Sequence, residues 1–248
     1  MTGALLGYRA VWDQKPVLRT VYNDMFDRIA AACVDGVTLE LGGGVGNLKE
    51  KVTSLISSDI QFAPWLDLVA DAQRLPFDSG ALSNIVMFDV LHHLEFPPLL
   101  FKEAARMLRP RGRIVMVDPA ITFGSALFYR ILHHEPVNMA ADPLPEGMPN
   151  PHRDPYDSNQ AIPTLLVTRH REAFHARFPD LRIADVRWFA FLAYPLSGGF
   201  KTWSLVTEPL ARTILAFERK LERALGRHLG FRLLIVIEKK DINSLADG

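Results

Sequence analysis

The chain has 248 residues, 48% of them hydrophobic, and its 28 Lys and Arg residues balance 28 Asp and Glu residues. A chain of this length can bury about three quarters of its unfolded surface in one core, so we expect one domain with lid insertions. A formal net charge of zero gives no overall positive field for a nucleic-acid backbone, so we expect no nucleic-acid partner.

The cysteine content and the hydropathy pattern exclude further kinds of protein. Cys33 is the single cysteine, which excludes an internal disulfide and a thiolate zinc cluster and fits a reducing, cytoplasmic location. The first 18 residues carry Arg9, Asp13 and Lys15 and do not resemble a signal peptide. No run approaches the roughly 18 uncharged apolar residues of a membrane span, so we expect no stable membrane insertion.

The first half of the chain predicts strands that alternate with other elements. Apolar residues at helical spacing predict a helix from Leu18 to Cys33, and a second helix is expected at 96–108. Short apolar runs predict strands at 37–41, 55–58, 66–70, 84–88 and 113–117. Such alternation is typical of an α/β, Rossmann-like, mostly parallel sheet with helices on both faces.

The second half is expected to complete this sheet around two insertions. Residues 120–162 are rich in Pro and predict a lid, followed by a helix at 164–178 and a strand at 181–191. An amphipathic helix at 209–226 separates that strand from the last one, at 231–237. The expected single domain thus has an N-terminal cap helix (1–36), a cofactor-binding core (37–119), the lid (120–162) and a C-terminal part (163–248).

Each of the first five predicted strands ends in an acidic residue. These residues are Glu40, Asp59, Asp71, Asp89 and Asp118. In open α/β sheets, ligands bind at the carboxyl ends of the strands, so these acids are candidates for one site. Acids are also common caps of strand-to-helix turns, and this alternative applies most to Asp118.

A glycine loop follows the first of these acids. The segment Glu40-Leu41-Gly42-Gly43-Gly44-Val45-Gly46-Asn47 contains GxGxG, in which the missing Cβ atoms let the backbone approach a ligand. The dinucleotide fingerprint GxGxxG would need glycine where Asn47 stands. Glu40 would also repel a pyrophosphate, whereas it suits a cofactor that carries an ammonium and a sulfonium.

The segments ELGGGVGN, SSDI, VADAQRLPFDSG, NIVMFDVLHHLEFP and ARMLRPRGRIVMVDP together resemble class I S-adenosylmethionine-dependent methyltransferases. They resemble especially the broad group that contains the ubiquinone and menaquinone C-methyltransferases and many small-molecule methyltransferases. The resemblance spans about a third of the chain, Val37 to Pro119, and implies a seven-stranded sheet whose last strand is antiparallel. Between Asp59 and Leu66 there is little room for the second helix usual in this fold.

The resemblance also implies how S-adenosylmethionine is bound and S-adenosylhomocysteine released. The methionine end would lie on Glu40, the glycines and Asn47. Asp59 with Ile60 would hold the ribose, and Asp71 with its neighbours the adenine. The methionyl side near the transferable methyl would face the end of the fourth strand. The implied residues after the glycine loop are Asp59, Ile60, Asp71, Ala72, Gln73, Phe88 and Asp89.

Methyl transfer needs alignment of the acceptor and, for a hydroxyl or an acidic carbon, a base. Histidine is suited to this near neutral pH, and the candidates are His92, His93 and His134. The first two could instead cap or pack a turn. His133 and Glu135 are candidates for substrate contact. A metal site is not expected, because neighbouring residues seldom face one ion and no third ligand is evident.

Aromatic residues suggest where an acceptor binds. Tyr8 and Trp12 precede the first predicted helix and could fold over the cofactor or simply pack on the domain edge. Phe191 and Tyr194 belong to an aromatic cluster that could line an acceptor pocket or form core and a homodimer interface. The helix at 209–226 has a basic edge that is either a solvated face or a contact for lipid headgroups.

The sequence therefore predicts methyl transfer from S-adenosylmethionine to an O or C atom of a small, partly apolar metabolite. One alternative is a catalytically silent, cofactor-binding partner or regulatory subunit, which would retain the same acids. A second alternative is an NAD-dependent oxidoreductase, disfavoured by Asn47 and by the lack of a Tyr-x-x-x-Lys pair.

Overall fold

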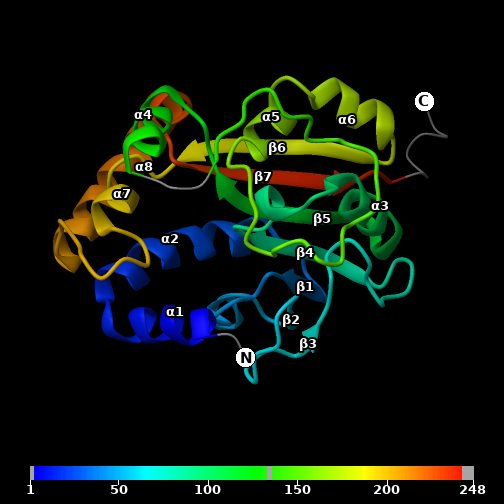
Figure 1. Cartoon of the computed structure of the whole chain (residues 1–248), viewed down its shortest axis with the longest axis horizontal. Coiled ribbons are helices and arrows are strands. Elements are labelled where there is room, and N and C mark those ends of the chain that lie inside the picture. Colours follow the sequence, from blue (N-terminus) through cyan, green and yellow to red (C-terminus); the bar gives the residue numbers. More distant parts are fainter. Residues whose placement is uncertain (1–2, 133–135, 242–248) are drawn as a thin grey trace.

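The computed structural model describes residues 3–132 and 136–241, which form a seven-stranded sheet in the order β3-β2-β1-β4-β5-β7-β6 (Figure 1). The first five strands in this order run parallel, and β7 is antiparallel to both β5 and β6. The predicted fold class is therefore confirmed. The strands are β1 (Thr38–Leu41), β2 (Leu55–Asp59), β3 (Leu68–Val69), β4 (Leu82–Phe88), β5 (Leu108–Pro119), β6 (Leu181–Phe189) and β7 (Arg232–Lys239).

The central strands are apolar on both faces because helices cover both sides of the sheet. Along β5, Ile114 and Met116 pack into one core cluster, whereas Val115 and Val117 pack into the other. This alternation follows from the two-residue period of a strand. The first cluster includes side chains of α3 (Pro97–Met107), α5 (Ile162–Val167) and α6 (Arg171–Arg177).

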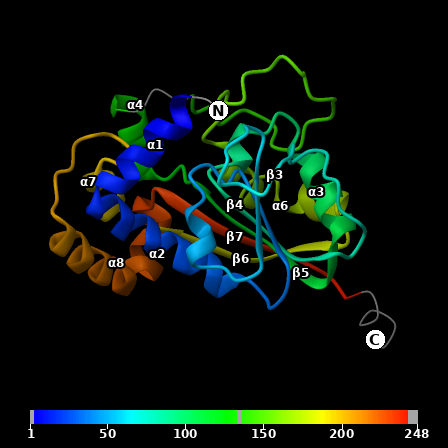
Figure 2. The same cartoon turned by 90° about the horizontal axis from the view of Figure 1, so that it is seen from below.

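The second face is covered by the N-terminal and C-terminal helices. Its core cluster joins α2 (Pro16–Ala32), α7 (Ala193–Ser197) and α8 (Glu208–Leu229) to the sheet. Figure 2 shows α1 (Gly3–Gln14) lying alongside α2, on the same side as α8. The start and the end of the chain thus cover one face together, which brings Met25 and Leu215 into the same core.

Several predicted elements differ from those in the structure. α1 was not predicted as a helix, and the strand expected at 66–70 is reduced to two residues. The helix expected at 164–178 is divided into α5 and α6, because the chain turns at Thr168–His170. The lid segment contains α4 (Phe123–Leu132) and, over residues 136–161, an irregular chain. Within the described ranges there are two short 3-10 helices, η1 (Asn47–Glu50) and η2 (Leu91–His93).

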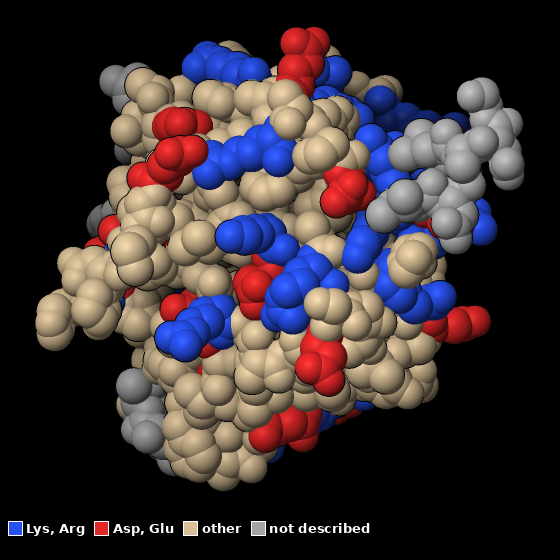
Figure 3. All heavy atoms as spheres, turned by 90° about the vertical axis from the view of Figure 1, so that its right-hand side faces the viewer, with Lys and Arg blue, Asp and Glu red and all other residues tan. Residues whose placement is uncertain are grey.

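The surface carries charges of both signs. On the face shown in Figure 3, acidic side chains lie among the Lys and Arg side chains. Where β5, β6 and β7 run together, Glu238 pairs with both Arg113 and Arg182. Among the described residues, no helix is long and apolar enough to cross a membrane.

Candidate active site

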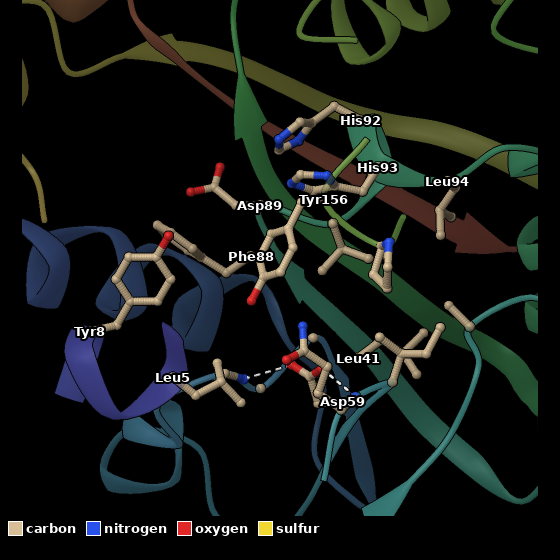
Figure 4. Close-up of a pocket in the computed structure, with 18 of the residues that line it drawn as sticks. Leu5, Tyr8, Leu41, Asp59, Phe88, Asp89, His92, His93, Leu94 and Tyr156 are labelled. Carbon is tan, nitrogen blue, oxygen red and sulfur yellow. Dashed lines mark hydrogen bonds between the residues drawn. The ribbon is translucent and has the colours of Figure 1, made fainter. Parts of the chain in front are cut away.

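A large cavity opens at the carboxyl ends of the parallel strands, with a volume of about 1520 Å³. Its lower part in Figure 4 is formed near Leu5, Leu41 and Asp59, and its upper part near Asp89 and the histidines that follow β4. Four of the five strand-end acids, all but Asp118, line this cavity. The sheet topology therefore gathers them at one edge, as the sequence predicted.

Glu40 is buried at the end of β1, with 4% of its surface exposed. Its Oε2 atom is buried without a hydrogen-bond partner among the described residues. Burial raises the pKa of this carboxyl from 4.5 to about 8; Lys49 opposes that rise, and Asp59 and Asp67 add to it. An unpartnered carboxyl is costly in a protein interior, and a cationic group of a ligand would satisfy it.

The glycine loop connects Glu40 to Asp59. Gly44 has a φ of +46°, a backbone conformation that a side chain disfavours, and its N–H donates to Asp59 Oδ2 at 3.0 Å. The indole of Trp65 donates to the Gly44 carbonyl at 2.8 Å. A Cβ atom on Gly46, where φ is +79°, would lie 2.9 Å from the Trp65 ring. The loop therefore adopts a fixed, open shape that needs glycine.

Asp59 and Asp71 both lie where their strands end. Asp59 accepts a second hydrogen bond, from the Gln61 N–H at 2.9 Å, and the chain from Gln61 to Asp67 contains no helix, as its length predicted. Asp71 accepts from the Gln73 N–H at 2.9 Å, which fixes the turn that carries Ala72. Both carboxylates keep lone pairs for a ligand, because each carboxylate offers about four acceptor sites.

His92 is paired with the acid at the end of β5. Its Nδ1 lies 2.7 Å from Asp118 Oδ1, and both side chains are buried. The second oxygen of Asp118 has no partner among the described residues. An ionised Asp118 makes Nδ1 the donor, so the proton-accepting position of the imidazole is Nε2. His93 stacks on His92 with ring centroids 4.1 Å apart.

Arg232 is a site residue that the sequence did not reveal. It is the first residue of β7, 3% exposed, and it pairs with Asp89 and donates to the Tyr194 hydroxyl at 2.7 Å. Asp89 has a φ of +57°, in the left-handed region that Asp tolerates better than most residues. No local pattern marks Arg232; it reaches Asp89 because β7 runs antiparallel beside β5.

The N-terminal helix and two loops form the outer wall of the cavity. Leu5, Tyr8 and Trp12 of α1 line it, together with residues 149–156 and 198–201. The Arg9 guanidinium lies 4.4 Å from the Trp65 ring centroid, which connects α1 to the glycine loop. Lys15 donates to the carbonyls of Gly199, Lys201 and Trp203 at 2.7–2.8 Å, which holds the second loop.

Most predicted site residues line the cavity. Gly46 and Phe191 do not; Phe191 is buried outside it, so its predicted contact with substrate lacks support. His133, His134 and Glu135 lie outside the described residues. The predicted residues that do line the cavity are Tyr8, Trp12, Glu40, Gly42, Gly43, Gly44, Asn47, Asp59, Ile60, Asp71, Ala72, Gln73, Phe88, Asp89, His92, His93 and Tyr194.

Residues 39–116 match the family model described as a methyltransferase domain. Among solved structures, a proposed sarcosine dimethylglycine methyltransferase from Galdieria sulphuraria aligns with a TM-score of 0.54 and 14% identity, over 97% of this chain and 99% of that one. A SAM-dependent methyltransferase from Thermotoga maritima, suggested to be a histamine N-methyltransferase, aligns with a TM-score of 0.54 and 15% identity over 91% of each chain. No curated protein sequence matched significantly.

Residues 39–116 thus match a methyltransferase domain, and the whole chain shares its fold with these two solved structures. S-adenosylmethionine is the cofactor that this domain indicates. The nearer resemblance to the ubiquinone and menaquinone enzymes stays a prediction.

The residues of the cavity fit this cofactor. The buried, unpartnered Oε2 of Glu40 suits an ammonium group, and the open backbone at Gly44 leaves space in front of the loop, where a Cβ atom would meet nothing closer than 3.9 Å. A carboxyl at this position does not suit a pyrophosphate. The individual roles predicted for Asp59, Asp71 and Ala72 stay predictions.

Proposed function

We propose that the protein is an enzyme that transfers a methyl group from S-adenosylmethionine to an O or C atom of a small, partly apolar metabolite. Single-ligand pockets typically measure about 300–1,000 Å³, and this cavity of about 1520 Å³ is larger. A volume of this size supports two ligands side by side, the cofactor on the glycine loop and an acceptor above it.

The pairing of His92 with Asp118 carries the proposal. Asp118 orients the imidazole through Nδ1 and stabilises the cation that forms when Nε2 accepts a proton. When bound, S-adenosylmethionine would supply an electrophilic methyl group on a positively charged sulfur. His92 Nε2 would take the proton that the acceptor atom loses on methylation, while Asp118 holds the imidazole in place.

Two parts of the outer wall, α1 and the loop at 198–201, would align the reactants and exclude water. Phe200, in the loop held by Lys15, packs on Tyr8 of α1 with ring centroids 5.1 Å apart. This contact joins α1 to the loop at 198–201. Alignment of reactants can contribute roughly 7–11 kcal/mol to catalysis, and these two segments would contribute part of it.

The test is a screen of hydroxyl compounds and acidic carbon compounds for methylated products by mass spectrometry, followed by His92→Ala and Asp118→Asn. We expect turnover to fall about 10²–10⁴-fold in His92→Ala, with the affinity for S-adenosylhomocysteine unchanged. His152→Ala, an exposed histidine at the same cavity, is the matched control and should retain activity. Unchanged turnover in His92→Ala would remove the histidine base.

A different outcome would support the alternative of a silent module. If the protein bound S-adenosylmethionine but methylated no compound of either class, the enzyme proposal would be rejected in favour of a cofactor-binding partner. The two results can be told apart. Failure of the histidine base is seen in the His92→Ala variant, whereas failure of the enzyme proposal is seen in the wild-type protein.

A further inference from the structure

Asp89 lies at the boundary between the two halves of the cavity. Its neighbour Val90 contacts the glycine loop so closely that a Cβ atom on Gly42 would come within 2.3 Å of it. On the other side, His92 and His93 follow Asp89 in the chain after only two residues and line the same cavity (Figure 4). A group bound by Asp89 would therefore lie beside both the cofactor half and the proposed base.

The carboxylate of Asp89 is held in place by Arg232. Arg232, with 4% of its side chain exposed, pairs with Oδ1 of Asp89. Its other terminal nitrogen binds the Tyr194 hydroxyl, and its guanidinium stacks over the Tyr194 ring at 4.4 Å. Asp89 itself keeps 30% of its side chain exposed. Among the described residues no further hydrogen bond to this carboxylate is found, so its cavity side can accept one from a ligand.

The charges around Asp89 decide which ligand group fits. The Asp89–Arg232 pair is neutral as a whole, so it offers no net negative charge to a cationic group of the acceptor. A carboxylate accepts hydrogen bonds and donates none, so an anion or an aprotic oxygen would not bind to it. A hydroxyl group carries no charge and can donate a hydrogen bond, so it suits this carboxylate.

The surroundings of this pair are aromatic. Phe88 and Tyr194 flank the Arg232 guanidinium, and Tyr22 packs on both Phe88 and Phe200 with centroids 5.3 and 5.2 Å apart. All these rings line the cavity. They offer an apolar surface to the body of a ligand whose polar group points to Asp89.

We propose that Asp89, positioned by Arg232 and Tyr194, is the subsite for a hydroxyl group of the acceptor, and that the acceptor is a hydroxyl compound with an apolar, ring-like body. This inference rests on the proposed function and narrows its acceptor class. Arg232 is a positioning residue, because it acts through Asp89 and does not touch the reacting atoms.

The experiment compares matched pairs of probes, alkylphenols and their methyl ethers, by ligand-observed NMR on protein saturated with S-adenosylhomocysteine. The phenol donates a hydrogen bond and the ether cannot. A hydrogen bond to a charged group contributes about 1.5–3 kcal/mol, so we expect wild-type protein to favour the phenol by about tenfold or more.

Asp89→Asn sharpens this test because Asn also tolerates a positive φ. The Asn oxygen would turn to the Arg232 guanidinium, which donates only, and its amide NH₂ would then face the cavity. The preference should therefore be lost, because the oxygen of the phenol and the oxygen of the ether can both accept a hydrogen bond from an amide. Asp154→Asn, an exposed acid at the same cavity, is the matched control and should keep the phenol preference. Arg232→Met should abolish the preference, whereas Arg232→Lys should retain part of it.

Equal binding of phenol and ether, no binding of either, or a phenol preference that persists in Asp89→Asn would each overturn the proposal. Circular dichroism and thermal unfolding of every variant show whether the fold is intact, and S-adenosylhomocysteine affinity shows whether Asp89 also contacts the cofactor. This binding test needs no turnover, so its failure is distinguishable from failure of the proposed methyl transfer. If the Arg232 variants do not fold, Asp89→Asn alone decides the result.

Discussion

Replacement of Glu40 by Gln should stabilise the free protein in alkaline solution while weakening cofactor binding. Burial raises the pKa of Glu40 from 4.5 to about 8, so the folded protein binds this proton more tightly than the unfolded chain does. The contribution to stability is therefore complete below pH 4.5 and is lost as the pH rises through 8. Gln resembles the protonated acid and cannot ionise.

The magnitude follows from the size of the shift. At about 1.4 kcal/mol per pH unit, the change from 4.5 to about 8 corresponds to at most about 5 kcal/mol of stability lost by wild type between acid and alkaline solution. Urea denaturation without cofactor at pH 6 and pH 9 measures the part of this loss between pH 6 and the pKa of about 8, which is about 3 kcal/mol. Glu40→Gln should show a smaller loss than wild type, and Glu50→Gln, an exposed neighbour, should match wild type. An identical pH dependence in wild type and Glu40→Gln would refute the reasoning.

The same carboxyl should release a proton when a cofactor ammonium binds. At pH 6.5, calorimetry of S-adenosylhomocysteine binding in buffers of different ionisation enthalpy should show close to one proton released by wild type, because nearly all Glu40 is protonated below its pKa of about 8. Glu40→Gln should release none. Methylthioadenosine, which lacks the ammonium, should release none from either protein. Proton release with methylthioadenosine would place its source outside Glu40.

Two further predictions concern the walls of the cavity. Lys15→Met leaves three loop carbonyls without their donor, so amide hydrogen exchange across residues 198–206 should accelerate about tenfold or more; unchanged exchange would show that Lys15 does not hold the loop. Trp65→Phe removes the hydrogen bond to Gly44 and should weaken S-adenosylhomocysteine binding by up to about tenfold, measured by calorimetry; an unaltered affinity would show that Trp65 does not fix the glycine loop.

The sequence predicted the fold where the local patterns were strong. The apolar runs that became β1, β2 and β4 each end in an acid, and the parallel sheet necessarily gathers those acids at one edge. α1 was missed because its buried residues, Leu5 and Trp12, are too few to make a clear apolar stripe. Its stability comes from packing on α2 and the glycine loop, which no local pattern encodes.

The sequence predicted most residues of the site but not the contacts between them. His92 was a candidate base, but its pairing with Asp118, 26 residues away, depends on the adjacency of β4 and β5. No local sequence pattern marked Arg232 as a site residue. Its partner Asp89 is 143 residues away, and their contact depends on the strand order. Long-range pairs of this kind are set by topology and need the structure.

The measurement that tests the central claim most directly is calorimetric titration of the purified protein with S-adenosylmethionine, S-adenosylhomocysteine and NAD(H), with Asp71→Ala as the comparison. We predict micromolar binding of the first two ligands, a marked loss in Asp71→Ala, and no binding of NAD(H). Binding of NAD(H) without binding of S-adenosylmethionine would contradict the assignment of this cavity to a methyl donor.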